Sequence, residues 1–266
     1  MDKTEFNSIP ERLLVLGYRW LASRLDLHSG VAGWFYCRAY FLYKNATEGK
    51  TMDAIVPFIR RNTMVIDVGA NIGSFARMIC RRSPATVLAF EPDPGNFRQL
   101  QRLVDSRTCR GRINASAKAL SDTTGPAFLY LSNLAPTDHK LVNTRSTKRI
   151  EIEATTLDDF LAGHTELAGT PVSLVKIDVQ GVELRVLAGM QETLRRNDFP
   201  PVLTEFSPSD LEAAGVSVDE FFRAFADLGY AAHRVPEGDA REPDWFVRNT
   251  GGYRNILMVR TASADT

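Results

Sequence analysis

The sequence predicts an α/β protein with a mostly parallel seven-stranded sheet and helices on both faces of that sheet. Short apolar runs, typical of strands buried on both faces, alternate with segments of helical periodicity along most of the chain. The run 255–260 follows the run 230–235 without a helical pattern between them, so we expect an antiparallel last strand. Of the 266 residues, 44% are hydrophobic, which is ample for a core.

A strand, a glycine-bearing turn and a helix follow one another near residue 70. Residues 64–68 form a mostly β-branched apolar run, which leads into a turn that contains Gly69, Asn71 and Gly73. Apolar residues then recur at helical spacing from Phe75. Glycines let the backbone turn tightly and approach a ligand closely, and the N–H groups at the start of the helix favour an electron-rich ligand. The unit therefore predicts a ligand-binding turn of the Rossmann-like kind.

An acid ends the next predicted strand, residues 86–90. Glu91 lies roughly 20 residues beyond the glycine turn, the separation expected for a carboxylate that binds a ribose. A carboxylate in this position can accept hydrogen bonds from both ribose hydroxyls. The sequence therefore predicts a cofactor that contains adenosine.

The acid at the end of the first strand indicates which adenosine cofactor binds. Nicotinamide and flavin enzymes normally present three glycines around a pyrophosphate, whereas this turn has two glycines and follows Asp67 closely. A carboxylate would repel a pyrophosphate, but it suits the sulfonium and ammonium cations of S-adenosyl-L-methionine. The alternative is a strand, turn and helix with incidental glycines, and the ordered presence of Asp67 and Glu91 argues against it.

The rest of the chain continues the alternation of strands and helices. Pro94 stands at a favoured first-turn position and begins a helix, and Thr155 or Thr156 caps a short helix over residues 157–161. The polar residues 132–149 form a loop, and its length is typical of a functional or disordered segment. The other predicted strands are residues 113–120, 127–131, 150–154, 172–179 and 201–206, and the other predicted helices are 182–196 and 218–228.

This topology brings several acids to one edge of the sheet. In open α/β sheets, ligands bind outside the carboxyl ends of the strands, near the point where the strand order reverses. We therefore expect one crevice to gather the acids that end or follow predicted strands. These acids are Asp67, Glu91, Asp122, Asp178 and Glu205.

Five motifs resemble those of the FkbM family and occur in that family's order: residues 66–73, 90–94, 119–122, 156–160 and 176–183. Members of the family are S-adenosylmethionine-dependent methyltransferases with the class I methyltransferase fold, and many methylate hydroxyls of sugars and polyketides. The resemblance implies an acceptor hydroxyl on a sugar, a glycolipid or a polyketide-type metabolite. The cofactor-binding residues expected from the turn and the motifs are Asp67, Gly69, Asn71, Gly73, Glu91, Pro92 and Asp122.

Transfer of a methyl group to a hydroxyl requires a base, because a neutral alcohol is a poor nucleophile. His139 in the polar loop is the predicted base by residue type, and a solvated loop histidine is the alternative. Lys176 and Asp178 share one face of a strand. Two roles are open: they form a buried ion pair that supports the pocket, or they position or deprotonate the acceptor. Glu205 ends the next strand and completes the predicted catalytic set.

Three other functions remain open on the sequence. An N-methyltransferase would use the same cofactor, although the tetrad [DN]-P-P-[YF] of nucleic-acid amino methyltransferases is absent after residue 179. An inactive binding protein would be marked by Gln180, where many family members have a glutamate, and a nicotinamide oxidoreductase is disfavoured by the glycine pattern. Asp178 and Glu205 alone are too few acids to predict a magnesium site, so we expect no metal.

Composition and the N-terminal segment bear on partners and location. The 32 basic and 32 acidic residues cancel, which argues against a nucleic-acid partner. We divide the chain into an N-terminal helical extension, residues 1–50, and a methyltransferase domain, residues 51–266. Neither a signal peptide nor a transmembrane segment is predicted, so we expect a cytoplasmic protein. The amphipathic and aromatic residues 11–43 are expected to cap the core or to contact a membrane surface.

Overall fold

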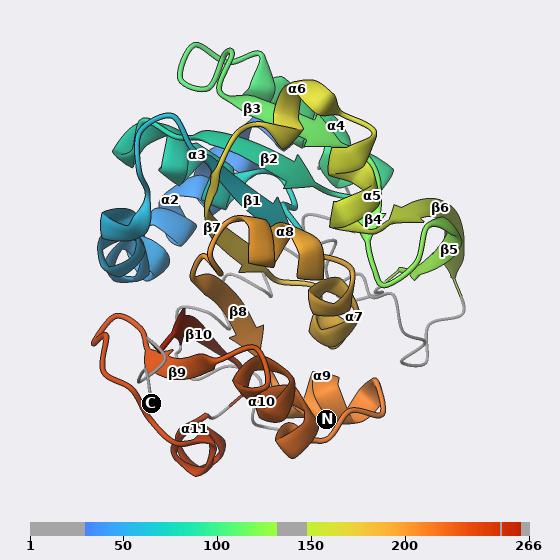
Figure 1. The fold of residues 1–266 in the computed structure, drawn as a ribbon. Helices are drawn as coiled ribbons and strands as arrows, with labels where there is room; N and C mark the ends of the chain where they lie inside the picture. The colour runs from blue at the N-terminus through green and yellow to red at the C-terminus, as the bar shows by residue number, and fades with distance from the viewer. Residues whose placement is uncertain (1–29, 132–147, 251, 262–266) are drawn as a thin grey trace.

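The computed structural model describes residues 30–131, 148–250 and 252–261. At its centre is a seven-stranded sheet in the order β3-β2-β1-β7-β8-β10-β9 (Figure 1). Neighbouring strands from β3 to β8 are parallel, and β10 is antiparallel to both β8 and β9, which confirms the predicted fold class. The strands are β1 (Met64–Val68), β2 (Thr86–Phe90), β3 (Ile113–Ser116), β7 (Val172–Ile177), β8 (Val202–Phe206), β9 (Tyr230–Arg234) and β10 (Arg254–Arg260).

Helices cover both faces of the sheet, and each face has its own apolar core. Successive side chains of a strand point to opposite faces, so in β1 Ile66 belongs to one core and Val65 to the other. The face of Val65 packs against α2 (Gly30–Ile55), α3 (Ser74–Arg82) and α4 (Pro94–Val104). The opposite face packs against α5 (Leu157–Ala162), α6 (Thr165–Ala168), α7 (Glu183–Ala188), α8 (Gln191–Arg196), α9 (Pro208–Ala213), α10 (Val218–Ala226) and α11 (Pro243–Asn249).

Local capping signals define where two of the predicted helices begin. Helix α4 starts at Pro94, and the carboxylate of Asp93 accepts a hydrogen bond of 2.7 Å from the backbone N–H of Asn96. Helix α5 is capped in the same way by Thr156, whose hydroxyl accepts the Asp159 N–H at 2.9 Å. Both starts were predicted from the residue types, because capping depends on neighbours only a few positions away.

The segment 113–120, predicted as one strand, is instead divided between two sheets. Strand β3 ends at Ser116, and the following β4 (Ala119–Leu120) pairs with β6 (Arg149–Thr155). Together with β5 (Gly125–Tyr130), these strands form a separate three-stranded sheet in the order β4-β6-β5. The segment contains no glycine or proline, so nothing in its local pattern indicates that the chain leaves the main sheet.

Two further predictions about the second half of the chain are wrong. The helix expected over 182–196 is broken into α7 and α8 at Gly189, whose backbone lies so close to Ser121 that an added Cβ would be 2.0 Å from the Ser121 carbonyl oxygen. The last two strands are connected through α11, although no helix was expected between them. Helix α9, after β8, was not predicted either.

Helix α2 runs without interruption from Gly30 to Ile55, across residue 50, where the sequence analysis divides the chain. Its C-terminal residues Met52 and Ile55 are buried in the core that contains Val65. The division into an extension and a domain stays a prediction. None of the helices in the described ranges has the length and hydropathy of a membrane-spanning segment.

Candidate active site

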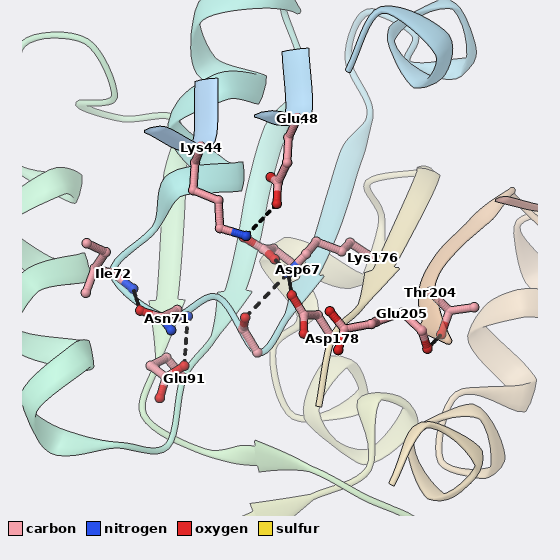
Figure 2. A network of polar contacts seen from close by, with 11 residues as sticks. Lys44, Glu48, Asp67, Asn71, Ile72, Glu91, Lys176, Asp178, Thr204 and Glu205 are labelled. Atoms are coloured by element: carbon pink, nitrogen blue, oxygen red, sulfur yellow. Dashed lines mark hydrogen bonds and ion pairs between the residues drawn. The ribbon is translucent and has the colours of Figure 1, made fainter. Parts of the chain in front are cut away.

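The acids predicted to meet at the sheet edge come from the carboxyl ends of neighbouring strands. Asp67 lies in β1, Asp178 directly follows β7, and Glu205 lies in β8, while Glu91 follows β2 on the other side of β1. Figure 2 shows these side chains around the turn after β1. The edge is also where the strand order reverses, so the fold places the acids where open α/β sheets bind ligands.

The turn after β1 has a left-handed backbone at three residues: φ is 73° at Gly69, 54° at Asn71 and 86° at Gly73. A Cβ on Gly69 would lie 2.0 Å from the Asp178 carbonyl oxygen, and a Cβ on Gly73 would lie 2.6 Å from Cδ2 of Leu103. The glycines were expected to allow close approach of a ligand. The structure shows that they also allow close approach of the protein's own chain.

Glu91 is held by two backbone N–H groups, one on each oxygen. Its Oε2 accepts the Asn71 N–H at 2.8 Å, and its Oε1 accepts the Asp93 N–H at 2.9 Å. Burial raises the pKa of Glu91 to about 7, and the two N–H groups oppose that increase. The carboxylate is thus oriented by the glycine turn on one side and by the start of α4 on the other, where the side chain of Asn96 also hydrogen-bonds it.

A buried lysine joins two of the acids. The Lys176 ammonium lies 3.3 Å from Oδ1 of Asp67 and 3.2 Å from Oδ2 of Asp178. Burial alone would lower the pKa of Lys176, but the charges of Asp178, Asp67 and Glu48 outweigh it and raise the pKa above its ordinary value. Lys176 therefore carries its proton at neutral pH, which suits the ion pair foreseen in the sequence and does not suit a base.

Asp67 has one oxygen that the described part of the chain does not satisfy. The residue is 0% exposed, and its Oδ2 has no hydrogen-bond partner among the described residues. Burial raises the pKa of Asp67, and the Lys176 ammonium limits the increase. A buried carboxylate oxygen without a donor is costly, so this atom marks a position where a ligand donor or cation would be stabilising.

Two glutamates lie on the side of the cluster away from Glu91. Both oxygens of Glu183 accept the Gly181 N–H at 3.0 Å, and burial raises the pKa of Glu183 to about 7. Burial, followed by the charges of Asp178 and Glu183, raises the pKa of Glu205 well above its ordinary value. This part of the site therefore concentrates acidic groups whose neutral forms are favoured by burial and by their mutual repulsion.

Helix α2 brings residues to the site that the sequence analysis missed. Lys44 and Glu48 form an ion pair of 2.5 Å, and both side chains point from α2 toward Asp67 and Lys176 (Figure 2). The Lys44 ammonium also lies 5.9 Å from the centre of the Tyr40 ring. The three residues are spaced four apart and so share one helix face, which is the signal that could have indicated a common role.

The structure places the other predicted site residues as follows. Asn71 donates its N–H to Glu91 and uses its side-chain oxygen to accept the Ile72 N–H at 2.7 Å, so it stabilises the turn. Pro92 connects β2 to α4, next to Glu91. Asp122 follows β4 and accepts a hydrogen bond of 2.9 Å from the Ser121 hydroxyl. His139 lies outside the described residues, and its role stays a prediction.

The described residues contain no group of three or more histidine, cysteine or acidic side chains arranged to hold a metal ion. Within those residues, three acids of the site are instead paired with a lysine or with backbone N–H groups. Asp67 and Asp178 share Lys176, and Glu91 accepts two backbone N–H groups.

The fold defines a Rossmann-like α/β protein, and comparison with known proteins identifies its family. The family model described as the methyltransferase FkbM domain matches residues 67–232, more than half of the chain. The chain therefore belongs to the FkbM methyltransferase family and is a methyltransferase, which confirms the resemblance of its motifs. The match includes the turn after β1 and the ends of β2, β7 and β8, but it excludes α2.

Several named proteins are similar to this chain. The 2-O-methyltransferase NoeI of Sinorhizobium fredii is 30% identical over 207 residues, which are 70% of this chain and 79% of the relative. The hexuronic acid methyltransferase AglP of Haloferax volcanii is 35% identical over 133 residues, which are 50% of this chain and 52% of the relative. A solved structure of a methyltransferase FkbM from Methylobacillus flagellatus is 19% identical and superposes with a TM-score of 0.43. The superposition covers 76% of the chain described here and 45% of the solved one.

Proposed function

We propose that this protein is an S-adenosyl-L-methionine-dependent O-methyltransferase, and that its acceptor is a hydroxyl of a sugar, a glycolipid or a polyketide-type metabolite. Membership of the FkbM family supports the methyl transfer. The names of two relatives, a 2-O-methyltransferase and a hexuronic acid methyltransferase, support a hydroxyl-bearing carbohydrate acceptor. The acids around the turn after β1 support the cofactor.

The residues at the sheet edge fit this cofactor. Glu91 offers an oriented carboxylate to the two ribose hydroxyls, and the turn from Gly69 to Gly73 would lie along the rest of the nucleoside. The unsatisfied oxygen of Asp67 suits a cationic group. When bound, the cofactor supplies a methyl group on a positively charged sulfur.

The acceptor would lie on the other side of the turn, above the ends of β7 and β8. There Lys176 is protonated and would position the acceptor or its neighbouring acids, because an ammonium cannot take up a second proton. Asp178 and Glu205 offer carboxylates that can accept the proton of an attacking hydroxyl. His139 lies in the segment predicted as a loop, outside the described residues, and remains a proposed base.

The observation that carries the proposal is the placement of Glu91, whose two oxygens are each fixed by one backbone N–H. Its test is calorimetric titration of S-adenosyl-L-methionine into the wild type and the Glu91→Gln variant. The substitution removes the charge and replaces one oxygen by an amide NH₂, which would face a backbone donor. We expect binding to weaken about 10- to 100-fold, the loss of one or more charge-assisted hydrogen bonds.

The matched control is Glu166→Gln, because Glu166 is exposed on α6 and its substitution should leave the affinity unchanged. Equal affinities of wild type and Glu91→Gln, with both folded, would contradict the assignment of the cofactor site. The type of acceptor is tested separately, with labelled cofactor and pairs of sugars that carry a hydroxyl or an amine at the same carbon. Label transferred to the amine alone would identify an N-methyltransferase.

A further inference from the structure

The arginines of this chain are unevenly distributed over its surface. Basic and acidic residues cancel over the whole sequence, yet three segments, residues 59–63, 81–86 and 105–112, are rich in exposed arginine. The one acid within these segments is Asp105. The exposed arginines of the three segments are Arg60, Arg61, Arg81, Arg82, Arg107 and Arg110.

The three segments lie side by side at one edge of the main sheet. They lead into β1, β2 and β3, which are parallel neighbours, so they meet at the amino ends of these strands. In Figure 1 the arrows of β1 and β2 point away from this edge. The Thr86 N–H donates to the Thr63 carbonyl oxygen at 3.1 Å, which joins the first two segments. The Arg112 side chain joins the other two, because it donates to the carbonyl oxygens of Ser83 and Ala85, each at 2.6 Å.

Most of these arginines have no acidic partner in the described ranges. Arg82 forms an ion pair of 2.7 Å with Asp53, and Arg110 donates to the backbone carbonyl oxygen of Asp105 at 3.3 Å, which does not neutralise its charge. Apart from Arg82, none of the exposed arginines of the three segments forms an ion pair with a described residue. We refer to the unpaired ones as the basic edge: Arg60, Arg61, Arg81, Arg107 and Arg110.

Helix stability accounts for one residue of the basic edge. Arg81 lies in the last turn of α3, where a cation interacts favourably with the helix dipole. The other four arginines lie outside helices, so this explanation does not apply to them. Like charges at one edge repel one another, and a partner of opposite charge would relieve that repulsion. Because a guanidinium can bind two phosphate oxygens at once, the basic edge suits a surface of phosphate groups.

An exposed aromatic side chain adjoins the basic edge. Phe58 is 37% exposed and ends the 3₁₀ helix Val56–Phe58, two positions before Arg60. A membrane surface accommodates both features, because anionic headgroups attract arginines and the boundary beneath the headgroups takes up apolar side chains. A single-stranded nucleic acid typically stacks successive bases on several aromatic rings, and the three segments contain no aromatic residue that could extend a stack from Phe58. The observations therefore favour a lipid surface.

We propose that the basic edge and Phe58 dock this protein reversibly on a membrane surface that contains anionic phospholipid. The arginines bind the lipid phosphates, and Phe58 enters the boundary between headgroups and acyl chains. Glu91, Asp178 and Glu205 lie at the carboxyl ends of the strands, which is the opposite edge of the sheet, so docking leaves the candidate active site open to water. The inference goes beyond the proposed function and does not depend on it.

The test is cosedimentation of the full chain with vesicles of phosphatidylcholine, with and without phosphatidylglycerol. We expect binding to the vesicles that contain phosphatidylglycerol, and we expect high salt to weaken it. The double variant Arg60→Gln/Arg61→Gln should bind these vesicles about 10- to 30-fold more weakly, since each basic residue near an anionic surface contributes about fivefold. Phe58→Ser should weaken the binding about 3- to 10-fold, because it removes the apolar contact.

The matched control is the double variant Arg223→Gln/Arg248→Gln, which removes the same charge from exposed positions of α10 and α11. Its vesicle affinity should equal that of the wild type, and urea unfolding should show that all variants are folded. Equal binding to both kinds of vesicle, or an equal loss in the two double variants, would overturn the proposal. Tighter binding to a single-stranded DNA oligonucleotide than to vesicles, unchanged in Phe58→Ser, would also overturn it and assign the basic edge to a nucleic acid. None of these measurements involves S-adenosyl-L-methionine, so the result is independent of the calorimetric test.

Discussion

Glu91 combines two properties that oppose each other. Its carboxylate must be ionised to accept hydrogen bonds from a diol, yet burial raises its pKa to about 7. The N–H groups of Asn71 and Asp93 reduce the cost of the charged form and also fix its direction. A protonated Glu91 would lose one of these bonds or one lone pair, so its protonation state controls the proposed cofactor site.

This conflict predicts a pH dependence of cofactor binding. Because Glu91 has a pKa of about 7 before binding, the affinity for S-adenosyl-L-methionine should increase about tenfold per unit from pH 5 to pH 7 and level off above that. Binding below pH 7 should also release a proton, measurable by calorimetry in buffers of different ionisation enthalpy. In Glu91→Gln both effects should disappear, and if they persist, another group is responsible.

His139 gives a prediction that belongs to the chemical step. If His139 is the base, His139→Ala should lower the turnover rate about 10²- to 10⁴-fold and leave the affinity for S-adenosyl-L-methionine intact. The control is His233→Ala, since His233 lies in β9 and its ring contacts the Gly238 carbonyl oxygen at 2.9 Å. Near-normal turnover of His139→Ala at saturating acceptor would leave Asp178 and Glu205 as the proposed bases.

Among the secondary-structure elements, the site depends on backbone hydrogen bonds that join the end of β1 and its turn to the ends of β2 and β7. The Gly69 N–H donates to the Phe90 carbonyl oxygen at 3.0 Å, and the Asp178 N–H donates to the Val68 carbonyl oxygen at 3.1 Å. These hydrogen bonds align the carboxyl ends of the three neighbouring strands β2, β1 and β7. The acids that follow the strands are therefore fixed relative to one another by the backbone.

Gly69→Ala should disrupt this arrangement. The new methyl group would lie 2.0 Å from the Asp178 carbonyl oxygen, in a backbone with φ of 73°, so the end of β7 must move. The left-handed conformation alone costs about 1–2 kcal/mol for a residue with a Cβ. We expect a lower free energy of unfolding in urea and at least a tenfold loss of cofactor affinity. Gly169→Ala is the control, because nothing lies within 4 Å of its added Cβ, and equal behaviour of the two variants would contradict the placement of the turn.

At the scale of the whole molecule, the buried carboxyls link the site to stability. Burial raises the pKa values of Glu91, Glu183 and Glu205 above the ordinary value for glutamate. Between the ordinary pKa and the raised one, the folded protein binds protons that the unfolded chain does not bind. Stability must therefore fall as the pH rises through that window. The protein therefore loses some free energy of unfolding at neutral pH because these acids are buried at the edge where its ligands are proposed to bind.

Glu183 allows this linkage to be measured. Its pKa is about 7 in the folded protein and ordinarily 4.5, so it should lower the free energy of unfolding by up to about 1.4 kcal/mol per pH unit between these values. In Glu183→Gln, urea unfolding at a series of pH values should show a shallower decrease from pH 5 to pH 7. The exposed Glu212→Gln should keep the wild-type slope, and an unchanged slope in Glu183→Gln would contradict the expected linkage.

Sequence patterns alone predicted the parts of this protein that depend on residues close together in the chain. The run of β1, the turn with Gly69 and Gly73, and the start of α4 at Pro94 are all set by residues a few positions apart. The same is true of Glu91, whose place at the end of β2 follows from one strand and one turn. The mostly parallel sheet with an antiparallel last strand was also predicted, from the alternation of strands and helices, and the family from five motifs in order.

The other features of the fold and the site depend on contacts between residues far apart in the chain. Local sequence patterns do not indicate such contacts. The break at Gly189 depends on Ser121, and the division of residues 113–120 depends on pairing with β6. The charge balance of the site depends on Lys176, which lies 109 positions from its partner Asp67. The presence of Lys44 beside Asp67 depends on the packing of α2 against the sheet (Figure 2). Only the tertiary structure brings such residues together, because burial and charge act through space and not along the chain.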